Sequence, residues 1–367
     1  MYKSAYYSPF LKSKRGETKA CQNLAPSVRK QLIPIFDVLA VPAEKRDPSK
    51  VKKHLELQIK HIVEAWSTGQ PCYVDLFDVE LALRAEGGIH PALLVFSSLS
   101  QSKVNSIPTI GLDRDTPYKI AVRSALALGF DSVAVRLQME DLLIPEKLGA
   151  ELKQLLDEIG AKDKALHVII DFRELHGVND SDLNKRALAG IIVAKTLGAV
   201  RIVVAGSSMI ASMAEVERDS TKLFDRRELI LWQKICTQGY KEISFGDYGI
   251  VSPSYSDLPF YITQNAAAKI RYATDFKWAI LKGRKWRDDT SQHAGLAAKL
   301  CAQNFFRGSD CWGGACIQKS ATKAESFKSH EVWTAIGQNV HMTHTAKLVE
   351  TVVSESIISG KPKTFVS

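Results

Sequence analysis

Eight short apolar runs that each end in a polar or charged residue constrain the fold of this chain most strongly. The runs are rich in β-branched and aromatic residues, and turn residues or helix-like segments separate them. They occupy residues 32–38, 71–79, 107–115, 132–138, 166–174, 200–208, 242–251 and 276–286. Runs of this length and composition predict buried β-strands.

Most intervals between the runs carry a helical pattern. Residues 48–66, for example, place Val51, Leu55 and Ile59 on one face, with Ser49 as a candidate N-cap. Repeated strand–helix alternation predicts parallel pairing with right-handed crossovers. Eight such units can close into a (β/α)₈ TIM-barrel-like sheet, which is the α/β fold we predict. An open doubly wound sheet is the alternative, but the expected glycine-rich turn after the first run is absent.

The predicted domain organisation is one barrel followed by a short extension. Residues 1–304 would form the barrel with a basic N-terminal segment, and residues 305–367 a C-terminal extension on the barrel, with residues 305–346 packed by Trp312, Ile317 and Trp333. So short a segment cannot bury enough apolar surface to fold alone. The least regular barrel unit is residues 252–275, where we expect one short helix near 264–272.

The polar ends of the runs predict a site. The C-terminal ends of barrel strands face one mouth, where side chains leave the packed core. Alternation places Ile169 and Asp171 on the same inward face. The residues at or just past the ends are Asp37, Asp75, Asp113, Arg136, Asp171, Ser207, Asp247 and Arg284, spaced 23 to 40 residues apart. We therefore expect Asp171 to reach Arg136 in a mouth ringed by acids.

Two interpretations of this ring stay open. Acids and arginines at strand ends can form ion pairs that satisfy one another, and an Asp after a strand often caps the next helix. Burying so much charge at one rim is costly, however, unless a ligand or a reaction benefits from it.

The functional interpretation assigns roles by residue type. Carboxylates can act as general bases or hold a divalent cation, so the candidate catalytic residues are Asp37, Asp75, Asp171 and Asp247. Cations can hold an anionic ligand, and the candidates are Arg136, Arg284 and Lys282. Ser207 lies in a Gly-Ser turn that could offer amides to phosphate, and Tyr248 opens the loop after the seventh run.

Cysteine and histidine residues crowd the C-terminal region without a metal-binding pattern. Four residues separate Cys311 from Cys316, and two separate His341 from His344, which is a looser spacing than structural zinc sites use. We predict no metal site there, and a hydrophobic cluster around Trp312 and the thiols instead. The six cysteines show no disulfide framework, which indicates reduced thiols in a cytoplasmic protein.

Charge and hydropathy limit the kinds of partner that this chain is expected to bind. The net charge is +9, and the excess is concentrated in residues 1–60 and 276–331. Basic ends are an argument for nucleic-acid binding, although no recognition motif accompanies them. No apolar stretch reaches the ~20 residues that a membrane span needs, and the first residues lack a secretory pattern, so we expect no membrane partner.

Several motifs, in order, resemble one family. The opening "YYSPFLKSKRGE" precedes "YVDL" (73–76), "AVRL" (134–137), "IIDF" (169–172) and "RYATD" (271–275). The C-terminal "FFRGSDCWGGACI" and "VWTAIGQNVHMTH" complete the series. From about residue 6 to 346 the chain resembles the phage-type beta protein family, named for the beta gene of the gop–beta–cin locus of a satellite phage.

The resemblance implies where genes of this family occur, but it implies no particular reaction. Family members occur in phages, prophages and mobile islands, often near defence or exclusion genes. Asn339 and His341 fall in the family-like C-terminal block and are candidate ligand-binding residues, with a hydrogen-bonded structural pair as the alternative. We expect a role in phage defence or exclusion, in which the mouth binds an anionic ligand or a protein partner encoded by a neighbouring defence gene. A metal-assisted hydrolase acting on a phosphodiester or nucleotide is the alternative, and it would require a divalent cation.

Overall fold

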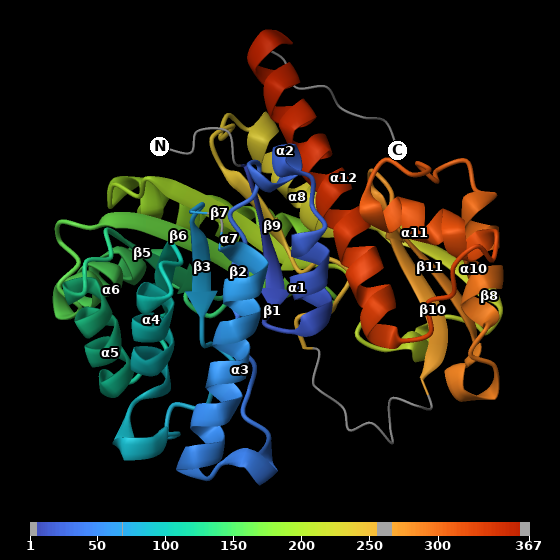
Figure 1. Ribbon diagram of the computed structural model, residues 1–367. Coiled ribbons are helices and arrows are strands. Elements are labelled where there is room, and N and C mark those ends of the chain that lie inside the picture. Colours follow the sequence, from blue (N-terminus) through green and yellow to red (C-terminus); the bar gives the residue numbers. More distant parts are fainter. Residues whose placement is uncertain (1–5, 68, 255–265, 360–367) are drawn as a thin grey trace.

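A closed barrel of eight parallel strands forms the centre of the computed structural model, which describes residues 6–67, 69–254 and 266–359 (Figure 1). The barrel strands are β1 (Tyr7–Lys12), β2 (Ile35–Asp37), β3 (Cys72–Asp75), β4 (Ser106–Ile110), β5 (Ser132–Leu137), β6 (Ala165–Glu174), β7 (Arg201–Ser207) and β9 (Ser244–Asp247). Pairing of β9 with β1 closes the ring. The predicted (β/α)₈ TIM-barrel-like fold is confirmed, and the open sheet is not observed.

Helices alternate with the barrel strands and surround them (Figure 1). They are α1 (Arg15–Gln22), α2 (Pro26–Arg29), α3 (Pro48–Trp66), α4 (Pro91–Gln101), α5 (Thr116–Ala127), α6 (Pro145–Glu158), α7 (Asp180–Thr196) and α8 (Arg227–Thr237). Short 3₁₀ turns are η1 (Ala43–Lys45), η2 (Glu86–Gly88), η3 (Met213–Glu215) and η4 (Trp286–Asp288). Helix α3 buries Val51, Leu55 and Ile59 as predicted. Its N-cap is Asp47 and not Ser49, because the Asp47 side chain accepts a hydrogen bond from the Ser49 amide at 3.1 Å.

The first barrel strand is one that the hydrophobic pattern did not reveal. β1 carries Pro9, and a proline within a short run argues against a central strand. In the structure β1 lies between β2 and β9 and is buried along its length. The seven runs from 32–38 to 242–251 contain β2 to β7 and β9 in chain order.

The predicted eighth barrel strand, residues 276–286, was wrong. Most of that run is β11 (Lys277–Lys285), the middle strand of a separate antiparallel sheet with β10 (Ala267–Ala273) and β8 (Ser220–Asp225). Because β1 already pairs with β9, the barrel has no free edge for another strand. The predicted helix near 264–272 was also wrong where it can be seen, since β10 occupies that region; residues 264 and 265 lie outside the described residues.

Helices from the C-terminal part of the chain pack on the small sheet. Helices α10 (Gln292–Cys301) and α11 (Trp312–Ala321) pack with it; Ile317 and Trp333 belong to a core cluster of its own, and the partly buried Trp312 packs against that cluster, so these three residues pack the region as predicted. The division at residue 304 stays a prediction, although β8 lies far earlier in the chain, between β7 and α8.

Helix α12 (His330–Ser359) joins the barrel to the extension, running diagonally between them (Figure 1). Every residue from 335 to 346 is buried, so this stretch has no solvent face. A helix that is buried all round lies inside a core, here between two. Its polar residues must therefore find partners within the protein.

Candidate functional site

The inward faces of four strands bring the predicted ring together at the C-terminal end of the barrel. Strand alternation points Asp37, Asp75 and Asp171 inward from the ends of β2, β3 and β6, and Arg136 inward from β5. All four side chains are at most 2% exposed. The structure therefore confirms that Asp171 lies in the mouth beside Arg136, Asp37 and Asp75.

Arg136 is the centre of this cluster, and we call these four residues with Tyr248 the mouth cluster. The Arg136 Nη2 donates to Asp171 Oδ2 at 2.6 Å, and Nε donates to the same oxygen at 3.0 Å. Its Nη1 donates to Asp75 Oδ2 at 2.6 Å and lies 3.4 Å from Asp37 Oδ1. One guanidinium thus holds three carboxylates, using its fork of fixed donors.

Aromatic side chains enclose the guanidinium. The Tyr248 hydroxyl accepts from Arg136 Nη2 at 2.9 Å and donates to Asp171 Oδ2 at 2.5 Å. The Phe10 ring stacks on Tyr248 with centroids 4.3 Å apart, and the Phe77 ring centre lies 4.4 Å from the Arg136 guanidinium carbon. These rings keep water from the ion pairs and add a cation–π attraction.

Two further cations satisfy the outer carboxylate oxygens. Lys12 Nζ donates to Asp37 Oδ2 at 2.9 Å and to Asp78 Oδ2 at 2.7 Å. Arg114 Nη2 donates to Asp75 Oδ1 at 3.2 Å, and its Nη1 donates to Asp113 at 2.6 Å. Asp37, Asp75 and Asp171 therefore each accept hydrogen bonds on both carboxylate oxygens.

Burial and charge act against each other on the pKa values in this cluster. Burial acts to raise the pKa of Asp37, but Lys12 and Arg136 outweigh it and hold that pKa below its ordinary value. For Lys12, burial acts to lower the pKa, and Asp37 and Asp78 outweigh it and raise that pKa. Both groups stay charged at neutral pH. They form ion pairs and do not supply a carboxyl group for proton transfer.

Arg173 stands apart from the saturated ion pairs. The β6–β7 register shifts between Asp171 and Glu174, and Arg173 has φ +50°, in the left-handed region. Its backbone amide donates to Asp171 Oδ1 at 2.9 Å, and its guanidinium carbon lies 4.5 Å from the centre of the Phe77 ring. Among the described residues, its buried Nη1 has no hydrogen-bond partner. Bulges, strained backbone and unpaired buried donors concentrate at functional sites.

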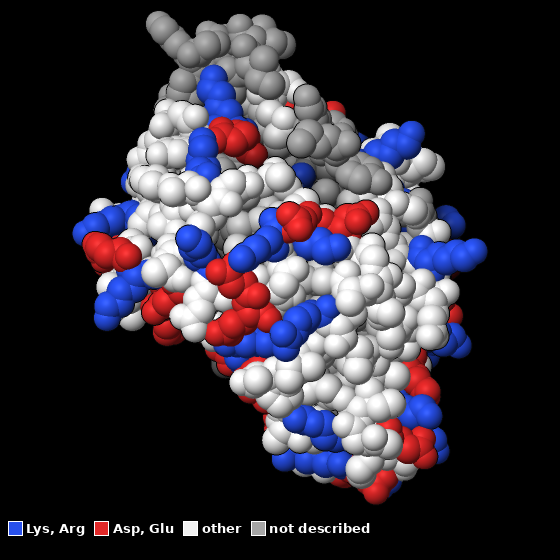
Figure 2. All heavy atoms as spheres, turned by 90° about the vertical axis from the view of Figure 1, so that its left-hand side faces the viewer, with Lys and Arg blue, Asp and Glu red and all other residues white. Residues whose placement is uncertain are grey.

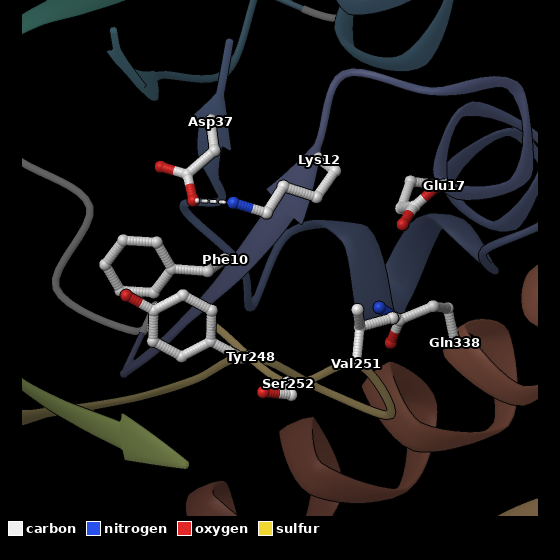
Figure 3. A pocket seen from close by; sticks show the side chains of 8 residues that line it. All are labelled: Phe10, Lys12, Glu17, Asp37, Tyr248, Val251, Ser252 and Gln338. Atoms are coloured by element: carbon white, nitrogen blue, oxygen red, sulfur yellow. Dashed lines mark hydrogen bonds and ion pairs between the residues drawn. The ribbon is translucent and has the colours of Figure 1, made fainter. Parts of the chain in front are cut away.

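Little space is left inside the mouth. A cavity of about 10 Å³ lies beside Lys12, Asp37 and Tyr248, and Figure 3 shows the Lys12–Asp37 ion pair and the stacked Phe10 and Tyr248 along its wall. That volume is about the minimum for one water molecule. A ligand would therefore contact the rim of the mouth and would not enter the barrel axis.

Asp247, a candidate catalytic residue, belongs to a second buried cluster. The Tyr7 hydroxyl donates to Asp247 Oδ1 at 2.8 Å, and His341 Nε2 lies 2.8 Å from Asp247 Oδ2. Arg226 Nη2 lies 3.4 Å from the same oxygen. Burial lowers the pKa of His341 despite the nearby carboxylate, so the neutral imidazole donates from Nε2. This cluster joins β1, β9 and α12, and His341 is completely buried.

The Gly-Ser turn after β7 already holds a carboxylate. The Ser208 amide donates to Glu228 Oε2 at 3.0 Å, and Ser207 Oγ accepts from the Met209 amide at 3.1 Å. Glu228 is buried, and burial raises its pKa. The predicted phosphate position at Ser207 is therefore taken by a side chain of the protein itself.

Three predicted ligand-binding residues lie away from the mouth. Arg284, expected near Asp171, is exposed on β11 and its Nε donates to Asp219 at 2.9 Å. Lys282 Nζ donates to the carbonyls of Met213 and Val216. That placement was wrong because β11 lies outside the barrel. Asn339 bridges the Gly313 amide and the Ala20 carbonyl and is completely buried.

The C-terminal thiols pack as the sequence suggested. Cys316 is in the core of the extension, with Cys301 and Cys311 packed against it. Among the residues that the structure describes, all six cysteines are free and no group of three or more His, Cys, Asp or Glu side chains is placed to hold a metal.

Several mouth residues were missed in the sequence. Lys12 ends β1 as the acids end their strands, but Pro9 obscured that strand. Arg114 directly follows Asp113, and Arg173 follows Asp171 by two residues in the same run. Both arginines could have been noticed by listing every charge near a predicted strand end. Their orientation depends on loop conformation, which the pattern does not encode.

The fold and the mouth define a parallel (β/α)₈-barrel protein with a buried charge cluster at the C-terminal ends of its strands. A family model described as Beta protein matches residues 7–347. The chain therefore belongs to the Beta protein family, as its motifs suggested. A comparison with curated proteins gave no match. None of the described helices is long and apolar enough to span a bilayer.

Proposed function

We propose that this Beta-family protein is a binding protein of a phage-defence or exclusion system whose barrel mouth holds an anionic ligand at Arg173. The observation that carries the proposal is the Arg173 guanidinium, which has a buried donor without a partner among the described residues. Leaving such a donor unpaired costs about 1–3 kcal/mol, which an anion would offset. The strained backbone that aims this side chain supports the same role.

The metal-assisted hydrolase is the less well supported alternative. Asp37, Asp75 and Asp171 all bind the guanidinium of Arg136, so their oxygens do not converge on a shared open position. A hard cation needs several oxygen ligands around one point. Holding one here would require Arg136 to leave three carboxylates.

Nucleic-acid binding through the basic ends stays the second alternative, and the face in Figure 2, which lies away from β10, β11, α10 and α11, adds no support to it. On the face of the molecule in Figure 2, Lys and Arg side chains are interspersed with Asp and Glu. That face has no continuous basic surface of the kind that tracks a phosphate backbone.

Isothermal titration with inorganic pyrophosphate in EDTA tests the proposal. We expect binding by the wild-type protein and about tenfold weaker binding by Arg173→Gln, because a charge-assisted hydrogen bond is lost. Arg284→Gln is the matched control, since it removes the same charge outside the mouth. Binding that requires a divalent cation, or equal affinity in Arg173→Gln, would refute the proposal.

A phage-plating assay tests the biological part. Cells that express the wild-type protein or Arg284→Gln should reduce plating of at least one phage in a broad panel. Cells with Arg173→Gln, at equal protein level, should lose that reduction. Protection that is unchanged in Arg173→Gln would separate any defence role from the mouth.

A further inference from the structure

The opposite end of the barrel is hollow. A cavity of about 760 Å³ opens among the first residues of the barrel strands, and we call it the N-terminal cavity. Ser132, Ala165 and Ser244 line it from β5, β6 and β9. These side chains lie on the inward face, as do Ala134, His167 and Gly246 two residues further along the same strands, and they are too small to fill the lumen. The volume is in the range of small-molecule sites.

Polar groups converge at the inner wall of this cavity. His167 and Arg201 both line it, and they are register partners on the neighbouring strands β6 and β7. The Tyr73 hydroxyl is 2.8 Å from His167 Nδ1, and Tyr73 is fully buried beneath them. A cation, an imidazole and a phenol thus share one side of the cavity.

Arg201 is the cation of this inner wall. Burial lowers the pKa of His167 to about 4, with Arg201 as the second cause, so the imidazole is neutral at pH 7. Burial also lowers the pKa of Arg201, while Tyr73 and Tyr6 act in the other direction. Two acids, Asp131 and Glu242, also line the cavity, and Glu242 accepts from Lys195 Nζ at 2.5 Å.

The outer part of the cavity is apolar. Leu128 and Val200 line it and are 56% and 53% exposed, with Val104 and Phe130 deeper in the wall. Exposed aliphatic side chains beside a cavity are typical of a surface that contacts an apolar group. The cavity therefore changes from cationic inside to apolar at its opening.

We propose that the N-terminal cavity binds a small molecule with an anionic head group and an apolar body. The head group lies against Arg201 and accepts a hydrogen bond from His167, and the body runs past Leu128 and Val200 toward solvent. This end of a (β/α)₈ barrel ordinarily serves stability, and active sites sit at the other. The site is separate from the mouth, and the proposal does not depend on the function proposed there.

Isothermal titration of the full-length protein with octanoate tests the proposal. We expect one octanoate per chain, bound more tightly than octanol, which lacks the charge, and than inorganic phosphate, which lacks the apolar body. Arg201→Gln should weaken octanoate at least about tenfold and change octanol less than about twofold. Arg201→Lys should recover part of the affinity, and Arg284→Gln should bind as the wild type does.

A second variant keeps the test decisive if Arg201→Gln does not fold. Ser132→Trp fills the cavity from β5 while leaving Arg201 in place, and it should abolish octanoate binding. The proposal is overturned if the wild-type protein does not bind octanoate. It is also overturned if a folded Arg201→Gln or Ser132→Trp binds octanoate with wild-type affinity.

Discussion

The two ends of this barrel are made by the same strands, yet one is filled with charge and the other is hollow. At the C-terminal end Arg136 binds three carboxylates, and a cavity of only about 10 Å³ lies beside them. At the N-terminal end the inward positions of β5, β6 and β9 are Ser132, Ala165 and Ser244, and about 760 Å³ is open. The size of the inward side chains therefore decides how far a ligand can enter the barrel at each end.

Removing Arg136, the central cation of the mouth cluster, should change the free energy of unfolding more than any other substitution considered, and it should separate the two ends of the barrel most clearly. Arg136→Met leaves three buried acids without their shared partner and should lower the free energy of unfolding by about 3–5 kcal/mol at pH 7. Arg201→Met at the hollow end should cost clearly less, because burial lowers the Arg201 pKa and so disfavours its charged form in the folded protein. Urea unfolding followed by tryptophan fluorescence measures both losses, and equal values would show that the ends do not differ in this way.

Asp171→Asn should have a smaller effect on stability. The variant keeps the shape of the side chain, and Arg136 retains Asp75 at 2.6 Å. We expect a loss of about 1–2 kcal/mol in the same urea experiment. Pyrophosphate binding should fall as well, because Asp171 Oδ1 accepts from the amide that fixes Arg173. A loss of 3 kcal/mol or more, by contrast, would mean that the mouth cluster is mainly structural.

The ends should also respond to acid in different pH windows. His167 has a folded pKa of about 4 against an ordinary 6.5, so the unfolded chain binds the proton first. Its contribution to stability is complete above pH 6.5 and is lost as the pH falls toward 4. The Asp37 pKa is held below 3.8, so its contribution is complete above that value and is lost only at lower pH.

Melting temperatures of two variants across pH 7 to 3 check these windows. His167→Gln should flatten the curve between pH 6.5 and 4, while other buried histidines, such as His293, keep part of the slope. Asp37→Asn should change the slope only below about pH 4. An unchanged slope in His167→Gln between pH 6.5 and 4 would contradict the assignment of a neutral, buried imidazole.

Most of the fold could be predicted from the sequence, because strand–helix alternation is a local pattern. Seven of the eight barrel strands follow from apolar runs, but β1 does not, since Pro9 makes a buried parallel strand look improbable. Because β1 was not recognised, residues 276–286 were needed as the eighth strand of the predicted barrel. Which strand closes a ring depends on long-range pairing, here β1 with β9, and no local pattern contains it.

The mouth was predictable to the extent that it depends on alternation. Asp37, Asp75, Arg136 and Asp171 meet because each is inward and near the end of its strand. Arg284 was predicted to lie at the mouth because its strand, β11, was predicted to be in the barrel. Arg173 was not identified because its direction depends on a bulge and a positive φ. The N-terminal cavity was also missed, because small inward residues give no signal until the ring is closed.

Native mass spectrometry with pyrophosphate and octanoate together tests most directly whether the two ends are separate sites. The wild-type protein should carry one of each ligand. With each ligand near its wild-type dissociation constant, Arg173→Gln should lose most of the bound pyrophosphate and keep octanoate, and Arg201→Gln should lose most of the bound octanoate and keep pyrophosphate. The account is contradicted if both variants lose the same ligand, or if either variant retains both.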